Sequence, residues 1–131
     1  MSHPPLHDPD RYPRLQIRLW LGPDCWIGPG KADLLELIDE TGSIAQAGRR
    51  MGMSYKRAWS LVEGMNRMFG EPLVTSERGG AGGGGAQLTD TGTKALHLFR
   101  GIQRDAARAS KAGTDAILQL QRKLPNPKRS N

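Results

Sequence analysis

Two helical segments separated by a very short turn constrain the fold of this chain more than any other feature. The first, "SIAQAGRR", begins at Ser43, and the second, "SYKRAWSLVEGMNRMF", begins at Ser54. A serine hydroxyl at a helix start accepts a hydrogen bond from a free backbone N–H, and Gln46 is placed to reach back and complete a capping box. Gly52 and Met53 provide the turn. A short helix, a turn with glycine and a longer helix are typical of a helix-turn-helix.

The apolar residues of both segments recur at helical spacing. The predicted buried stripes are Ile44, Ala47 and Met51 in the first helix, and Ala58, Leu61, Val62, Met65 and Phe69 in the second. Small side chains at Ala45, Ala47 and Gly48 allow the second helix to cross the first closely. The outward face of the second helix is then predicted to carry Lys56, Arg57, Ser60, Glu63 and Arg67.

The first turn of the second helix carries the main candidate binding residues. These are Ser54, Tyr55, Lys56 and Arg57, with Ser60 one turn later. In helix-turn-helix proteins this part of the second helix meets base edges in the major groove of DNA. Lys and Arg donate to guanine O6 and N7, and Ser and Tyr bond bases or phosphates. A solvated helix face is the alternative interpretation.

Three neighbouring residues have two interpretations each. Trp59 is either a packing residue, as tryptophan more often is, or a base contact. Arg49 and Arg50 end the first helix. Cations there complement the negative end of the helix, and they are also placed to contact phosphates.

A run of glycine lies between two short strand candidates, "PLVTSE" and "AQLT". Six of the seven residues from Gly79 to Gly85 are glycine, and Arg78 precedes them. A phosphate-binding P-loop would need a following lysine and helix, and a flexible linker would be richer in serine. A hairpin tip is favoured, because glycine N–H groups, with Gly82, Gly83 and Gly84 at the centre, approach phosphate oxygens without an intervening Cβ. A helix-turn-helix followed by such a hairpin is a winged helix.

The rest of the chain completes a mainly α fold with a small β component. A strand is predicted over residues 14–21, with "CWI" as a short return strand, and "GKADLLELIDETG" is predicted to be a helix. A long helix follows from about residue 90, with Gly113 placed to interrupt it. The predicted division is a flexible tail at 1–13, a winged helix-turn-helix domain at 14–89, a long dimerisation helix at 90–124 and a basic tail at 125–131.

Composition favours an anionic partner and offers little for catalysis. The 131 residues carry a net charge of +6, with a pI near 10.0, which is typical of nucleic-acid-binding domains. The single cysteine excludes an intramolecular disulfide framework. The chain has neither a long apolar run nor a signal-peptide pattern, so a cytoplasmic protein with no membrane contact is expected. The histidines are scattered, and no catalytic constellation is evident, so we expect no enzyme, no metal and no cofactor.

The segments "LLELIDETGSIAQAGRRMGMSYKRAW", "MNRMFGEPLV" and "GGAGGGGAQLTDTG" resemble the DNA-binding domain of the ModE family of molybdate-responsive regulators. The resemblance covers about residues 14–112, and the helix-turn-helix with its "FGEPLV" exit is also similar to LysR-type regulators. It implies a winged helix-turn-helix that dimerises through its long helix and binds a palindromic operator in double-stranded DNA. By this resemblance, Ser54 to Arg57 lie on the recognition helix, Arg78 with Gly79 to Gly85 forms the wing, and Ser43 matches a capping serine. Family members carry C-terminal molybdate-binding modules, and this chain ends about where they would begin, so molybdate binding is not expected of this chain alone.

The long helix also favours a dimer on its own pattern. Its stripe, formed by Leu96, Phe99, Ile102, Ala106 and Ala109, needs a cover, either from a second copy or from the N-terminal strand. The sequence therefore predicts a dimeric, sequence-specific transcription regulator with recognition helix 54–68 in the major groove and wing 78–86 on the backbone or minor groove. A winged-helix protein–protein adaptor and a small phosphate-binding enzyme are the alternatives.

Overall fold

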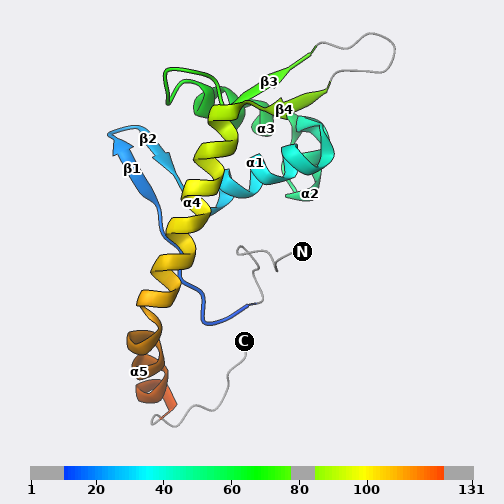
Figure 1. The fold of residues 1–131 in the computed structure, drawn as a ribbon. Helices are drawn as coiled ribbons and strands as arrows, with labels where there is room; N and C mark the ends of the chain where they lie inside the picture. The colour runs from blue at the N-terminus through cyan, green and yellow to red at the C-terminus, as the bar shows by residue number, and fades with distance from the viewer. Residues whose placement is uncertain (1–10, 78–84, 123–131) are drawn as a thin grey trace.

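The computed structural model describes residues 11–77 and 85–122 and shows a winged helix-turn-helix (Figure 1). The mainly α fold with a small β component is confirmed. Residues 1–10, the glycine run at 79–84 with Arg78, and the basic tail lie outside the described residues. The elements in chain order are β1 (Leu19–Gly22), β2 (Cys25–Ile27), α1 (Pro29–Thr41), α2 (Ile44–Arg50), α3 (Tyr55–Asn66), β3 (Val74–Ser76), β4 (Ala86–Leu88), α4 (Asp90–Ala109) and α5 (Lys111–Arg122).

Both predicted serine caps are present. Ser43 Oγ accepts from the Gln46 N–H, and Ser54 Oγ accepts from the Arg57 N–H, each at 3.1 Å. The predicted capping box is wrong in its second half, because the Ser43 N–H donates to Thr41 Oγ1 at 3.1 Å and the Gln46 side chain is left exposed. The chain reverses at Gly42, with φ of +71°, and this brings the end of α1 next to the start of α2.

The turn between α2 and α3 depends on glycine at two places. Gly52 has φ of +73°, a conformation that side chains disfavour. Gly48 faces α3 so closely that a Cβ there would lie 2.9 Å from the Ala58 Cβ. The predicted close crossing of the two helices therefore rests on Gly48, together with the buried Ala47.

The core lies between α1, α2, α3 and the start of α4. Its fully buried side chains include Leu34, Leu35, Ile38, Val62, Met65, Leu73 and Phe99. Phe69 was predicted to be part of the α3 stripe, but this is wrong: the helix ends at Asn66, and Phe69 is 37% exposed. Met51 and Leu61 are half-buried at the edge of the core.

Two small antiparallel hairpins occur among the described residues. β3 pairs with β4 in the register Val74–Leu88 and Ser76–Ala86, which forms the base of the wing. β1 pairs with β2, with Trp20 opposite Trp26. The strand predicted over 14–21 begins only at Leu19, because the three-residue β2 offers no partner to the residues before it.

The β1–β2 hairpin is attached to α1 through Trp26. The Lys31 ammonium lies 3.6 Å from the centre of the Trp26 ring and donates to the Trp26 carbonyl at 3.1 Å, and the Arg18 guanidinium carbon lies 3.8 Å from the same ring centre. Burial lowers the pKa of Lys31. These cation–π contacts hold the hairpin at Trp26, next to the buried Ile27, while Leu19, Trp20 and Leu21 of β1 remain exposed.

The long helical region consists of α4 and α5, which meet at Ser110. The interruption was predicted at Gly113, which instead lies inside α5. Backbone hydrogen bonds continue across the junction, from Ser110 N–H to Ala106 O at 3.0 Å and from Thr114 N–H to Ser110 O at 2.8 Å. Figure 1 shows α4 crossing beside α1 and α5 continuing away from the helix-turn-helix.

A charged cluster attaches α4 to α1. The Arg100 guanidinium donates to Asp33 Oδ1 at 2.7 Å and to Glu36 Oε1 at 2.8 Å. Leu96 and Phe99, on the same part of α4, are buried in the core, at 5% and 2% exposure. Beyond this point the predicted stripe leaves the core, and Ile102 is 41% exposed.

Candidate nucleic-acid interface

The first turn of α3 presents the predicted residues to solvent. Tyr55, Lys56, Arg57 and Ser60 are all exposed, whereas Ala58 between them is fully buried. The helix is oriented this way because Ala58, Val62 and Met65 lie on one side of it and pack into the core. Two cations, a phenol and a hydroxyl are therefore available on one face of a helix whose start is fixed by the Ser54 cap.

Tyr55 rests against Trp59. The ring centroids are 6.1 Å apart and the rings meet edge to face at 75°. Trp59 is half-buried against the core, so it packs as tryptophan usually does, while Tyr55 remains 59% exposed. Trp59 therefore lies between the core and the exposed ring of Tyr55.

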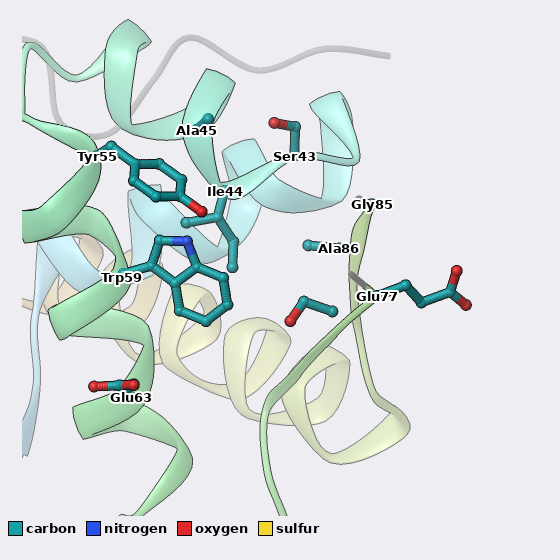
Figure 2. Close-up of a pocket in the computed structure, with 10 residues that line it drawn as sticks. Ser43, Ile44, Ala45, Tyr55, Trp59, Glu63, Glu77, Gly85 and Ala86 are labelled. Atoms are coloured by element: carbon teal, nitrogen blue, oxygen red, sulfur yellow. The ribbon is translucent and has the colours of Figure 1, made fainter. Parts of the chain in front are cut away.

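A hollow of about 680 Å³ lies between α3, the start of α2 and the base of the wing (Figure 2). Its helical side carries Tyr55 and Trp59, and Ser43 and Ile44 come from the start of α2. The remaining lining residues are Ala45, Glu63, Ser76, Glu77, Gly85 and Ala86.

Two carboxylates line this hollow and were not predicted to belong to the site. The sequence predicts Glu63 on the outward face of α3 and assigns no role to Glu77, but both line the hollow. Carboxylate oxygens accept from amino groups of bases, such as cytosine N4, and repel phosphates. Glu77 follows β3 at the rim of the hollow, and in Figure 2 its side chain points away from Trp59 and Glu63.

The base of the wing is fixed to the body of the domain. The Glu77 N–H donates to Gly85 O at 2.9 Å, and the Ala86 N–H donates to Gly42 O at 2.9 Å. The hairpin therefore continues to the edges of the glycine run and is attached to the end of α1. The predicted contacts at Arg78, Gly82, Gly83 and Gly84 lie outside the described residues and stay predictions.

Further cations flank the site. Arg49 and Arg50 are exposed in the last turn of α2, and Arg50 lies 3.5 Å from Glu40 in an ion pair open to solvent. Such an exposed pair contributes little to stability.

Within residues 11–77 and 85–122, no group of three or more His, Cys, Asp or Glu side chains could hold a metal ion. In the same residues, no helix has both the length and the apolar character needed to cross a bilayer.

Comparison with known proteins agrees with this geometry. Residues 31–93, from the first turn of α1 into the first turn of α4, match the family of bacterial regulatory helix-turn-helix proteins of the LysR family. The chain is 42% identical over 82 residues to the molybdenum-pterin-binding protein MopB of Rhodobacter capsulatus, covering 63% of this chain and 30% of MopB. It is 43% identical over 70 residues to the molybdenum transport protein ModE of Azotobacter vinelandii, covering 53% and 26%.

The chain is thus similar to ModE proteins over part of its length. The match to the DNA-binding transcriptional dual regulator ModE of Escherichia coli K12 is 41% over 71 residues, which is 54% of this chain and 27% of that protein. The chain thus spans less than a third of the length of the relatives it matches. The residues matched by the helix-turn-helix family, 31–93, include α2, α3 and the residues that line the hollow.

Proposed function

We propose that this chain is a sequence-specific, DNA-binding transcription regulator that acts as a homodimer. The observation that carries the proposal is the first turn of α3, where Tyr55, Lys56 and Arg57 are exposed on a serine-capped helix whose other side is buried. A helix in this position enters the major groove in helix-turn-helix proteins. The similarity to ModE proteins, one of them named as a DNA-binding regulator, supports the same function.

The proposed contacts divide into two groups. Lys56, Arg57, Tyr55 and Ser60 are assigned to base edges and adjacent phosphates, because they lie on the exposed face of α3. Arg78 and the glycine run are assigned to the sugar–phosphate backbone or the minor groove, because the base of the wing lies across the hollow from α3 (Figure 2). Phosphate contacts would supply much of the affinity and make it strongly dependent on salt.

Ser43 is assigned to a supporting role at this surface. It lines the hollow, and its oxygen already accepts from the Gln46 N–H at 3.1 Å. Its hydroxyl proton remains available to a phosphate oxygen, since a serine hydroxyl is both donor and acceptor.

A protein–protein adaptor is the competing function, and the surface chemistry argues against it. An adaptor surface on α3 would be expected to expose several apolar residues. The outward residues are instead mostly charged or hydroxyl-bearing, namely Lys56, Arg57, Ser60, Glu63 and Arg67, with Tyr55 as the exposed aromatic.

The homodimer is proposed from the apolar face of α4 and α5. Leu98 is 70% exposed, and Ile117 and Leu120 are 66% and 63% exposed. α5 spans twelve residues and contributes no buried residue, although isolated helices of this length are marginal in water. Packing against a second copy would bury these side chains and would present two recognition helices to successive major grooves, about 34 Å apart.

Selection of bound duplexes tests the proposal directly. The chain is incubated with a random-sequence pool and with genomic fragments, at low and moderate salt, with and without molybdate. We expect a palindromic site whose affinity falls steeply with salt. Enrichment of a site without two-fold symmetry would contradict the homodimer, and the absence of enrichment at low salt would contradict DNA recognition.

A further inference from the structure

Asn66 joins the end of α3 to the start of β3. Its side-chain Oδ1 accepts from the Leu73 N–H at 2.8 Å and from the Val74 N–H at 3.0 Å, and its Nδ2 donates to the Val74 carbonyl at 3.0 Å. A carboxamide can do this because it carries both a donor and an acceptor, as a peptide group does. Asn66 therefore pairs with the backbone of β3 much as a neighbouring strand would.

The same segment is also held by the start of α4. The Thr89 N–H donates to Leu73 O at 2.9 Å, and Thr89 Oγ1 donates to Pro72 O at 2.7 Å. A Cβ at Gly92 would lie only 2.1 Å from Leu73 O, so the backbone of α4 lies directly against this carbonyl. Residues 72–74 are thus held between the last residue of α3 and the first turn of α4.

Asn66 lies at the opposite end of α3 from the exposed first turn. At 1.5 Å per residue, Tyr55 and Asn66 are separated by about 16 Å along the helix axis. A rotation of α3 by about 10° around its Asn66 end would therefore move the first turn by about 3 Å. Neighbouring bases in a strand of DNA are about 3.4 Å apart. A change of about 10° in the direction of α3 would therefore displace its first turn by nearly one base-pair step.

We propose that Asn66 is a positioning residue for DNA recognition, which fixes the direction of α3 relative to the wing and to α4. The proposal rests on the proposed function, in which α3 reads DNA and α4 with α5 forms the dimer. Asn66 acts through the backbone of β3 rather than on DNA. In the dimer, this link would set the separation and the angle of the two recognition helices.

Two variants test the proposal. Asn66→Ala removes the donor and the acceptor, whereas Asn66→Asp keeps the Oδ1 acceptor and replaces the Nδ2 donor with a carboxylate oxygen that faces the Val74 carbonyl. The probes are the duplex that the wild-type protein selects from a random pool, the same duplex with its half-site spacing changed by one or two base pairs, and a random duplex.

Asn66→Ala should bind the selected duplex about ten-fold more weakly, bind the random duplex nearly as well as the wild type does, and discriminate less between spacings. Asn66→Asp should change in the same direction, because its second carboxylate oxygen cannot donate to the Val74 carbonyl. The control is Ile38→Val, which removes a methyl group from the core at α1 and should leave the spacing preference intact. Equal losses by Asn66→Ala on both duplexes, with an unchanged spacing preference, would show a purely structural role.

A measurement without DNA separates this proposal from the proposed function. In a Cys25→Ser background, spin labels on Ser60→Cys in α3 and Lys94→Cys in α4 report the distance between these helices. Asn66→Ala should broaden the distance distribution, and an unchanged distribution refutes the proposal even if the protein binds DNA. If the wild-type protein selects no duplex, the proposed function fails, and the labels still decide whether Asn66 orients α3.

Discussion

The helices α3 and α5 have the same length of twelve residues and opposite surroundings. α3 buries Ala58, Val62 and Met65, whereas no residue of α5 is buried and its Ile117 and Leu120 are mostly exposed. Both sequences are amphipathic at helical spacing. An amphipathic pattern therefore shows that a helix needs a partner, but it does not show whether the same chain supplies it.

Connectivity explains the difference between the two helices. α3 follows α2 after a turn at Gly52, and Gly48 allows the two helices to cross in close contact. α5 follows α4 with backbone hydrogen bonds continuing across Ser110, so it extends away from the core (Figure 1). In the proposed homodimer, the apolar face of α5 finds its partner in the second copy.

The largest loss of stability is expected from a methyl group added to the first turn of α4. Gly92→Ala places a Cβ 2.1 Å from the backbone oxygen of Leu73. Backbone has to shift to relieve this overlap, so we expect the free energy of unfolding to fall by about 4 kcal/mol or more. Urea denaturation followed by circular dichroism measures it.

The matched control for Gly92 lies in α5. A Cβ at Gly113 would meet nothing within 4 Å. Gly113→Ala should therefore leave the fold intact and stabilise the helix by about 0.5–1 kcal/mol, because alanine is the better helix former. A similar loss of stability in both variants would mean that α5 is packed as tightly as the start of α4.

A cavity in the packed side of α3 should have the next largest effect. Met65 is fully buried, so Met65→Ala should lower the free energy of unfolding by about 2–5 kcal/mol. The loss should not depend on protein concentration, because the core lies within one chain. Thermal melts at two concentrations check this, and a loss that disappeared at high concentration would place Met65 in an intermolecular contact.

The exposed faces of α3 and α5 should respond differently to loss of an arginine. Arg57→Ala should weaken binding to the selected duplex by about 1–3 kcal/mol if its guanidinium reads a base. The Ser54 cap should survive, since it uses the Arg57 backbone N–H. Arg122→Ala, in the last turn of α5, is the control and should have little effect. Equal weakening on a random duplex would assign Arg57 to a phosphate.

Local signals in the sequence were sufficient for the packed part of the fold. The serine caps, the glycine turn and the apolar stripe of α3 depend on residues close together in the chain, and the structure confirms them. In this part, the sequence-based prediction was wrong at two places, the capping box of α2 and the end of α3. The Ser43 N–H donates to Thr41 Oγ1 instead of to the Gln46 side chain. Helix α3 ends at Asn66, three residues before Phe69.

The candidate site was only partly predictable, because it joins segments far apart in the sequence. The exposure of Lys56 and Arg57 follows from helical periodicity and is confirmed. The place of Glu77 at the hollow and the contacts of Asn66 depend on where β3 lies, and no periodicity in the chain indicates its position. The assignment of these residues to DNA remains a prediction, as do the wing contacts at Arg78 and Gly82 to Gly84.

The smallest expected effect, that of Leu120→Ala on self-association, shows whether α5 packs against a second copy or within its own chain. Leu120 is 63% exposed in one copy, so Leu120→Ala should leave the unfolding of dilute protein almost unchanged. It should weaken self-association by about 1–2 kcal/mol, because a leucine side chain would lose its contact with the second copy. Sedimentation equilibrium measures the association, with Gln119→Ala as an exposed polar control on the same helix. If Leu120→Ala lowered stability at every concentration, as Met65→Ala should, α5 would find its partner within its own chain. The contrast between the two helices would then disappear.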